Sequence, residues 1–151
     1  MTDVVLTVGN AMMGDDAAGP MLAALLREAP APGWEVVDGG AAPENVIHRV
    51  RALAPARVLV VDATDMDLAP GTIRIVDEIY IAQNAIMTTH DLPLSFLISA
   101  LRESVPRVDL IGVQPAVVFF GYPVTPAVRE AVAAIHAQLR AGQPIEAWPR
   151  L

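Results

Sequence analysis

Two short runs of almost uninterrupted apolar residues constrain the fold of this 151-residue chain more than any other feature. Val4 to Val8 and Arg57 to Val61 are both of strand length and rich in β-branched side chains. Strands that are apolar on both faces are typical of parallel sheets covered by helices on each side. The sequence therefore predicts a sheet buried between two helical layers.

Three further strands are indicated, at residues 34–38, 72–76 and 109–113, and helical patterns alternate with the strands. The helices are marked by apolar faces at helical spacing: Leu22, Leu25 and Leu26; Val46, Val50 and Leu53; Leu94, Leu97, Ile98 and Leu101; Val128, Val132, Ile135 and Leu139. This alternation predicts a three-layer α/β/α sandwich. Right-handed crossovers would place the first and third strands side by side.

The fourth strand, residues 72–76, breaks the parallel pattern. The spacer from residue 62 to residue 71 is too short for a crossover helix, so this strand is expected to run antiparallel to the third. Its alternation of Ile and Arg indicates an edge strand. We expect one domain over residues 1–151, with residues 143–151 as a C-terminal tail packed through Trp148.

Composition narrows the function classes. The chain has no cysteine, which excludes disulfides, thiolate metal sites and a Cys nucleophile. Its net charge is −7 and no basic face is visible, so a nucleic-acid partner is not expected. No apolar run approaches the roughly 18 residues of a membrane span, and the start lacks the basic region of a signal peptide. We expect a cytoplasmic protein with no membrane partner.

The loop after the first strand carries two adjacent acids, Asp15 and Asp16, before the helix that begins near Met21. In open α/β sheets, ligands bind at the carboxyl ends of the strands, which is where this loop lies. We interpret Asp15 as the helix N-cap and Asp16 as a candidate ligand. The alternative is that both are ordinary acids at a helix start, where the dipole favours them.

Two residues far along the chain are candidates to join Asp16. Asp62 ends the third strand, and His90 precedes the third helix, with Asp91 as its expected N-cap. Two carboxylates and an imidazole suit a divalent transition metal such as nickel, zinc or iron. Each residue also has a structural reading, because Asp62 could cap a turn and His90 could simply lie at the helix entry.

Other residues have weaker claims. His48 and His136 lie inside predicted helices and are interpreted as structural or solvated. Asp38 ends a strand, but the glycines after it favour a turn role. The loop methionines Met12 and Met13, with Met87, either line an apolar cleft or only pack. The chain also lacks a Gly-x-Ser-x-Gly elbow, a P-loop and a dinucleotide fingerprint.

The whole chain resembles the [NiFe]-hydrogenase maturation endopeptidases, in particular the branch that serves hydrogenase 3 of the formate hydrogenlyase system. The motifs that carry the resemblance keep their order and spacing: Val8-Gly9-Asn10, Met12-Met13-Gly14-Asp15-Asp16, Asp38-Gly39-Gly40, Ala42-Pro43-Glu44-Asn45, Val61-Asp62-Ala63-Thr64-Asp65-Met66, Met87-Thr88-Thr89-His90, Leu92-Pro93-Leu94, Ile111-Gly112-Val113-Gln114-Pro115 and Tyr122-Pro123. Each motif is short, but the ordered set is specific.

The resemblance implies a phosphorylase/hydrolase-like fold with a five-stranded mixed sheet of order 2-1-3-5-4, strand four antiparallel. It implies that Asp16, Asp62 and His90 contact a metal and that Asp16 and Asp62 are catalytic. Many relatives have Glu at the first of these positions, and the hydrogenase 3 branch has Asp, as here.

The implied enzyme is a peptidase, aspartic-type or metal-assisted, that removes the C-terminal extension of a [NiFe]-hydrogenase large-subunit precursor after nickel insertion. The implied cofactor is nickel supplied by that precursor, and we expect a monomer. Two alternatives use the same three residues. A non-enzymatic nickel-binding chaperone would bind without cutting, and a general metal-dependent hydrolase would turn over small esters or amides.

Overall fold

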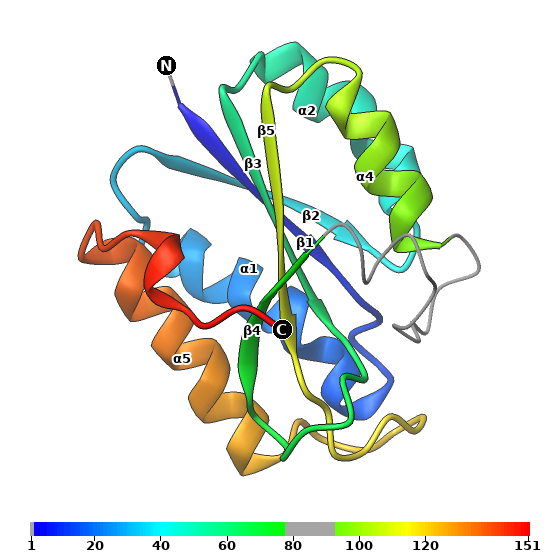
Figure 1. Ribbon diagram of the computed structural model, residues 1–151. Helices are drawn as coiled ribbons and strands as arrows, with labels where there is room; N and C mark the ends of the chain where they lie inside the picture. The colour runs from blue at the N-terminus through cyan, green and yellow to red at the C-terminus, as the bar shows by residue number, and fades with distance from the viewer. Residues whose placement is uncertain (1, 78–92) are drawn as a thin grey trace.

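A computed structural model describes residues 2–77 and 93–151 and shows a central mixed sheet (Figure 1). Its strands are β1 (Asp3–Val8), β2 (Trp34–Gly40), β3 (Arg57–Ala63), β4 (Ile73–Val76) and β5 (Arg107–Val113). The order is β2-β1-β3-β5-β4, and β4 alone runs antiparallel to its neighbour, β5. The predicted strand order and the predicted direction of β4 are both confirmed.

Two helical layers cover the sheet, as predicted (Figure 1). On one face lie α1 (Ala18–Glu28) and α5 (Pro126–Arg140), and on the other α2 (Ile47–Leu53) and α4 (Leu94–Arg102). Short 3₁₀ turns are η1 (Gly14–Ala17), η2 (Pro43–Val46) and η3 (Ile145–Ala147). Successive side chains of β3 alternate between two apolar clusters, because neighbouring residues of a strand point to opposite faces. None of the described helices is long and apolar enough to cross a membrane.

The second helix departs from its predicted face. Val50 is fully buried, but Leu53 is 38% exposed and belongs to the surface. The predicted helical spacing fails because the segment starts as a 3₁₀ turn and becomes α-helical only at Ile47. The two kinds of helix turn by different angles per residue, so Leu53 does not lie on the face predicted for a continuous α-helix. The helix then ends at Ala54, whose φ of 45° lies in the left-handed region.

The C-terminal tail covers the outer edge of β4. The Ile75 N–H donates to Pro149 O and the Leu151 N–H donates to Ile75 O, both at 2.9 Å. Trp148 packs against the cluster beneath α1 and α5, as predicted. An edge strand with free backbone groups is a template for association, and this pairing occupies part of that edge.

Ion pairs link β3, β5 and η3 at the amino end of the sheet. Arg57 on β3 pairs with Asp109 on β5 and with Glu146 on η3, each at 3.0 Å. Arg107 pairs with the same two carboxylates. The chemistry-bearing acids discussed below lie at the opposite, carboxyl end of the strands, so these charges belong to the scaffold.

Candidate functional site

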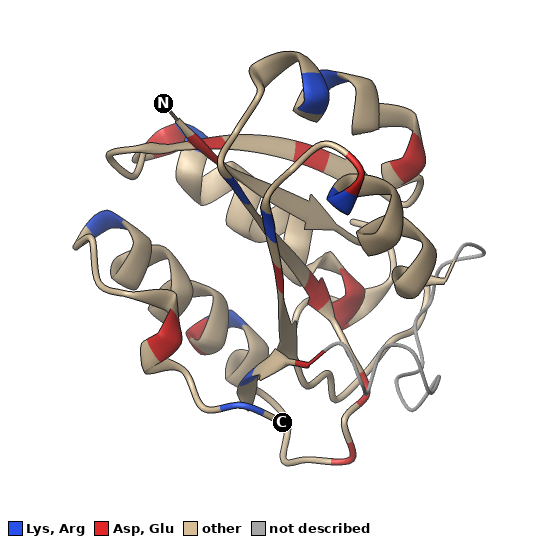
Figure 2. Ribbon diagram, turned by 45° about the horizontal axis from the view of Figure 1, so that its top comes forward, with Lys and Arg blue, Asp and Glu red and all other residues tan. Residues whose placement is uncertain are grey.

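Four loops meet at the carboxyl end of the parallel strands. They follow β1, β2, β3 and β5, and the antiparallel β4 begins there, opposite the last residue of β5. Figure 2 shows acidic positions, in red, in this region of the molecule. Two of the predicted site residues, Asp16 and Asp62, are in this region, and each is at most 1% exposed.

Asp15 is a buried clamp and not a helix cap. The turn η1 already begins at Gly14, so Asp15 lies inside it, and no side-chain cap bond is made there. Its carboxylate accepts the backbone N–H groups of Ala116 (2.8 Å), Val117 (3.0 Å) and Thr125 (2.7 Å), together with the Thr125 hydroxyl. The predicted structural role is therefore right, but the predicted partner is wrong.

These hydrogen bonds set the charge state of Asp15. Burial by itself would raise the pKa of the carboxyl, because it disfavours the charged form. The N–H groups of Thr125, Val117 and Ala116 and the Thr125 hydroxyl outweigh burial, so the pKa lies below its usual value of 3.8. Asp15 is thus a fixed negative charge that holds both ends of the loop between β5 and α5.

Asp16, the next residue, has only one of its two carboxylate oxygens hydrogen-bonded within the described part of the chain. Its Oδ2 accepts the backbone N–H of Asn10 at 2.8 Å. Its Oδ1 is buried and makes no hydrogen bond within the described part of the chain. Buried polar atoms in native structures almost always have a partner, and an exception calls for an explanation.

The loop around Asp16 needs glycine at two points. Gly9 has φ of +145°, and a Cβ there would lie 2.0 Å from the carbonyl oxygen of Asp16. Gly14 has φ of +59°, and a Cβ there would lie 2.5 Å from the carbonyl oxygen of Val117. Close backbone approach therefore presses the loop against both the Asp16 turn and the loop after β5.

Asp62 is fully buried near the end of β3. It lies opposite Gly112 of β5, while Val61, before it, lies opposite Thr7 of β1. The alternation along β3 directs Asp62 toward the layer formed by α2 and α4, since Val60 packs in that cluster. Because η1 also contacts β3, the elements that carry Asp16 and Asp62 adjoin at this end of the sheet.

Gln114 fixes the loop that follows Asp62, a role that was not predicted from the sequence. Its side-chain oxygen accepts the N–H groups of Met66 (2.6 Å) and Leu68 (3.3 Å). Its amide nitrogen donates to Asp65 Oδ1 at 3.2 Å. The only available signal was a glutamine directly after a buried strand, which indicates a satisfied buried amide but not its partner.

The third predicted ligand, His90, lies outside the described residues, as do Asp91 and Met87. Within the described ranges no group of three His, Cys, Asp or Glu side chains is arranged to hold a metal. His136 accepts or donates a 2.8 Å hydrogen bond with Ala29 O, and His48 is exposed, which agrees with their structural or solvated readings.

The turn role of Asp38 is confirmed in a modified form. Its Oδ1 accepts the Thr7 hydroxyl at 3.2 Å and the N–H of Gly40 at 3.0 Å. The two glycines do not close the strand as predicted but complete it, and the β1–β2 register shifts beside them. Asp38 therefore supports an irregular stretch of sheet next to the Asp16 loop.

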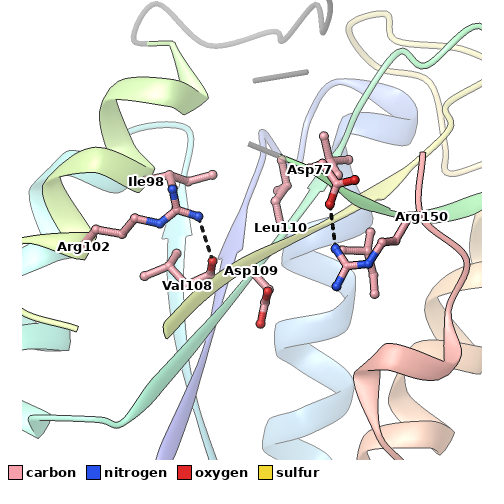
Figure 3. A pocket seen from close by; sticks show the side chains of 9 residues that line it. Asp77, Ile98, Arg102, Val108, Asp109, Leu110 and Arg150 are labelled. Atoms are coloured by element: carbon pink, nitrogen blue, oxygen red, sulfur yellow. Dashed lines mark hydrogen bonds and ion pairs between the residues drawn. The ribbon is translucent and has the colours of Figure 1, made fainter. Parts of the chain in front are cut away.

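A pocket of about 180 Å³ lies between β4, β5, α4 and the tail (Figure 3). Arg150 in it pairs with Asp77 at 2.6 Å, and Arg102 donates to Val108 O at 3.2 Å. Typical ligand pockets measure roughly 300–1,000 Å³. Its small size and internally paired cations make it a weaker candidate site than the carboxyl end of the strands.

Comparison with known proteins gives a consistent result. Residues 21–141 match the family model described as hydrogenase maturation protease. The chain is 52% identical, over 139 residues, to the hydrogenase 3 maturation protease of Escherichia coli K12, covering 92% of this chain and 89% of that protein.

Solved structures agree. A crystal structure of a hydrogenase 3 maturation protease superposes with a TM-score of 0.92 at 48% identity, covering 100% of this chain and 97% of the other. The solution structure of the endopeptidase HycI from Escherichia coli gives a TM-score of 0.91 at 47% identity, with the same coverage.

Proposed function

The chain belongs to the hydrogenase maturation protease family, and from that premise we propose that it removes the C-terminal extension of a [NiFe]-hydrogenase large-subunit precursor of the hydrogenase 3 type after nickel insertion. It would act as a monomer in the cytoplasm. One observation carries the assignment of the site: the buried Oδ1 of Asp16, which has no hydrogen-bond partner among the described residues, while Oδ2 of the same carboxylate accepts the Asn10 N–H.

The donor chemistry fits nickel held by the substrate. Carboxylate oxygens and an imidazole suit borderline divalent metals, and Asp16 offers a desolvated oxygen that nothing in the described chain occupies. Asp62 and His90 would complete the set. In support, Asp62 faces the layer that contains α4, and His90 shortly precedes α4 in the sequence.

The precursor-borne metal would polarise the scissile carbonyl or activate water. The chain's own contribution is positioning and proton transfer. The Asn10 N–H fixes Oδ2 of Asp16, which leaves Oδ1 to face the substrate. One of the two carboxylates, Asp16 or Asp62, would accept the proton of the attacking water, so that hydrolysis needs neither a serine nor a cysteine.

The test uses nickel-loaded and nickel-free precursor with three purified proteins: the natural chain, Asp16→Asn and Glu35→Gln. Glu35 is an exposed acid on β2, so its variant controls for loss of one negative charge. We expect the natural chain and Glu35→Gln to shorten only nickel-loaded precursor, and Asp16→Asn to bind it without cutting.

The possible results separate the competing functions. Binding of nickel-loaded precursor without cutting by the natural chain would favour the chaperone. Equal cutting of both precursor forms would refute nickel dependence, while turnover of small ester or amide reporters without precursor would favour a general hydrolase. Full activity of Asp16→Asn would remove Asp16 from the site.

A further inference from the structure

Exposed apolar side chains gather beside the candidate site. Met12 is 60% exposed, Phe119 and Phe120 are each 63% exposed, and Tyr122 is 55% exposed. These four, here called the aromatic surface, are among six large apolar side chains exposed in the described residues. Single exposed apolar residues are common, but a contiguous group marks an interaction site.

The aromatic surface is one structure built from two loops. The Gly121 N–H donates to Met12 O at 2.9 Å, which joins the loop after β5 to the loop after β1. Phe119 and Tyr122 meet edge to face, with ring centroids 5.4 Å apart. Phe119 and Tyr122 are therefore held together in the free protein, on a loop that is bonded to the loop of Met12.

Contacts of Asp15 fix the position of the aromatic surface relative to Asp16. Asp15 clamps residues 116, 117 and 125, at both ends of the aromatic loop, and its own N–H donates to Val117 O at 2.7 Å. The next residue in the chain is Asp16. A binding loop fixed in advance loses little conformational entropy when a partner binds, which increases affinity.

Charge indicates what kind of partner fits. The chain carries no Asp, Glu, Lys or Arg between Asp109 and Arg129, so the aromatic loop itself is uncharged. At the same end of the sheet, the loop after β3 exposes Asp65 and Asp67. An apolar segment without acidic residues complements this arrangement better than an acidic one.

We propose that the aromatic surface is the docking site for an apolar segment of the precursor close to the scissile bond. This inference rests on the proposed function and names the part of the enzyme that selects its substrate. Aromatic side chains dominate the energetics of interfaces, so Phe119 and Phe120 should contribute most of the affinity.

The test measures equilibrium binding of purified nickel-loaded precursor in an Asp16→Asn background, so that bound precursor stays intact. The variants are Phe119→Ala with Phe120→Ala, Phe120→Ser alone, and Leu53→Ala as the matched control. Leu53 is exposed at the end of α2, at the opposite end of the sheet. Thermal unfolding of each variant verifies folding, and sedimentation records its oligomeric state.

We expect the double variant to weaken precursor binding by at least about tenfold, the single variant to weaken it less, and the control to bind as the parent does. Unchanged binding by the folded double variant overturns the docking site. A parent dimer that dissociates in the double variant, with precursor affinity unchanged, assigns the surface to a second copy of the chain instead.

The same design separates the two proposals. Cutting of precursor by the natural chain is measured independently and decides the proposed function. If the natural chain cuts and the double variant binds normally, only the docking site is wrong. If the natural chain does not cut and the double variant still weakens precursor binding, the docking site stands and only the proposed function is wrong.

Discussion

Replacing Asp15 with asparagine should destabilise the protein, whereas the same change at its neighbour Asp16 should not. The Asp15 carboxylate accepts three backbone N–H groups and one hydroxyl. An asparagine retains one acceptor oxygen. In its best orientation the oxygen still serves Ala116 and Val117, and the amide nitrogen then faces the N–H of Thr125, which is also a donor.

The size of the loss follows from these contacts. One buried N–H without a partner costs about 1–3 kcal/mol, and each remaining bond loses the roughly 1 kcal/mol that the charge adds. The variant no longer buries a charge, which offsets part of this loss, so the free energy of unfolding should fall by about 2–4 kcal/mol. For a domain of this size, that lowers the Tm by roughly 5–15 °C.

Asp16 provides the internal control. Its Oδ2 makes one hydrogen bond, to the Asn10 N–H, and its Oδ1 makes none within the described chain. Asparagine keeps the oxygen that Asn10 needs and removes a desolvated charge. The expected change in unfolding free energy is within about 1 kcal/mol, although the proposed cutting activity is lost.

The assay is thermal unfolding near neutral pH, followed by circular dichroism and by the fluorescence of Trp34 and Trp148, which both pack against the core. The clamp role of Asp15 is refuted if Asp15→Asn melts within about 1 °C of the natural chain. It is also refuted if Asp16→Asn loses as much stability as Asp15→Asn, because the two carboxylates would then have equivalent structural roles.

Three further predictions concern stability. The pKa of Asp15 is lowered in the folded state, so ionised Asp15 stabilises the folded protein fully above pH 3.8. This stabilisation is lost as the pH falls through the lowered pKa. The free energy of unfolding of Asp15→Asn should therefore depend less on pH in the acid range than that of the natural chain. Gly14→Ala should lower the free energy of unfolding by more than about 2 kcal/mol, because the added methyl meets a carbonyl oxygen at 2.5 Å. Gly121→Ala should lower it by only about 1 kcal/mol, because Gly121 has φ of +80° but open space around it. Chemical denaturation measures both changes. Deleting residues 149–151 should lower the Tm by a few degrees and promote self-association in sedimentation, because it uncovers the edge of β4.

The layers and the direction of β4 were predictable because they depend on local patterns. Strands apolar on both faces require helices on both sides, and a short spacer before β4 forbids a parallel crossover. The apolar face of α5 was predicted correctly, since Val128, Val132, Ile135 and Leu139 are all buried and a long apolar stripe is a strong signal. The strand order itself came from the family resemblance.

The partners of polar residues were not predictable. Asp15 bonds to groups more than a hundred positions away, and no local pattern distinguishes a first-turn acid that caps a helix from one that clamps a distant loop. The hydrogen-bond partners of Gln114 and of the C-terminal tail were equally unpredictable, because they depend on which loops and strand edges the folded sheet brings together. Asp16 and Asp62 were predictable as candidates from their place at strand ends, and the geometry of the set with His90 stays a prediction.

The contrast between the two adjacent acids has a geometric origin. They belong to a 3₁₀ turn, in which successive side chains are separated by about 120° around the axis. One carboxylate can therefore point into the donors of the loop after β5 while the next points away from them, toward the Asn10 turn. An α-helical start would separate the two side chains by only about 100° and over a shorter rise. The tight turn thus lets one residue anchor the aromatic surface and its neighbour remain available for substrate, with no flexible linker between the two tasks.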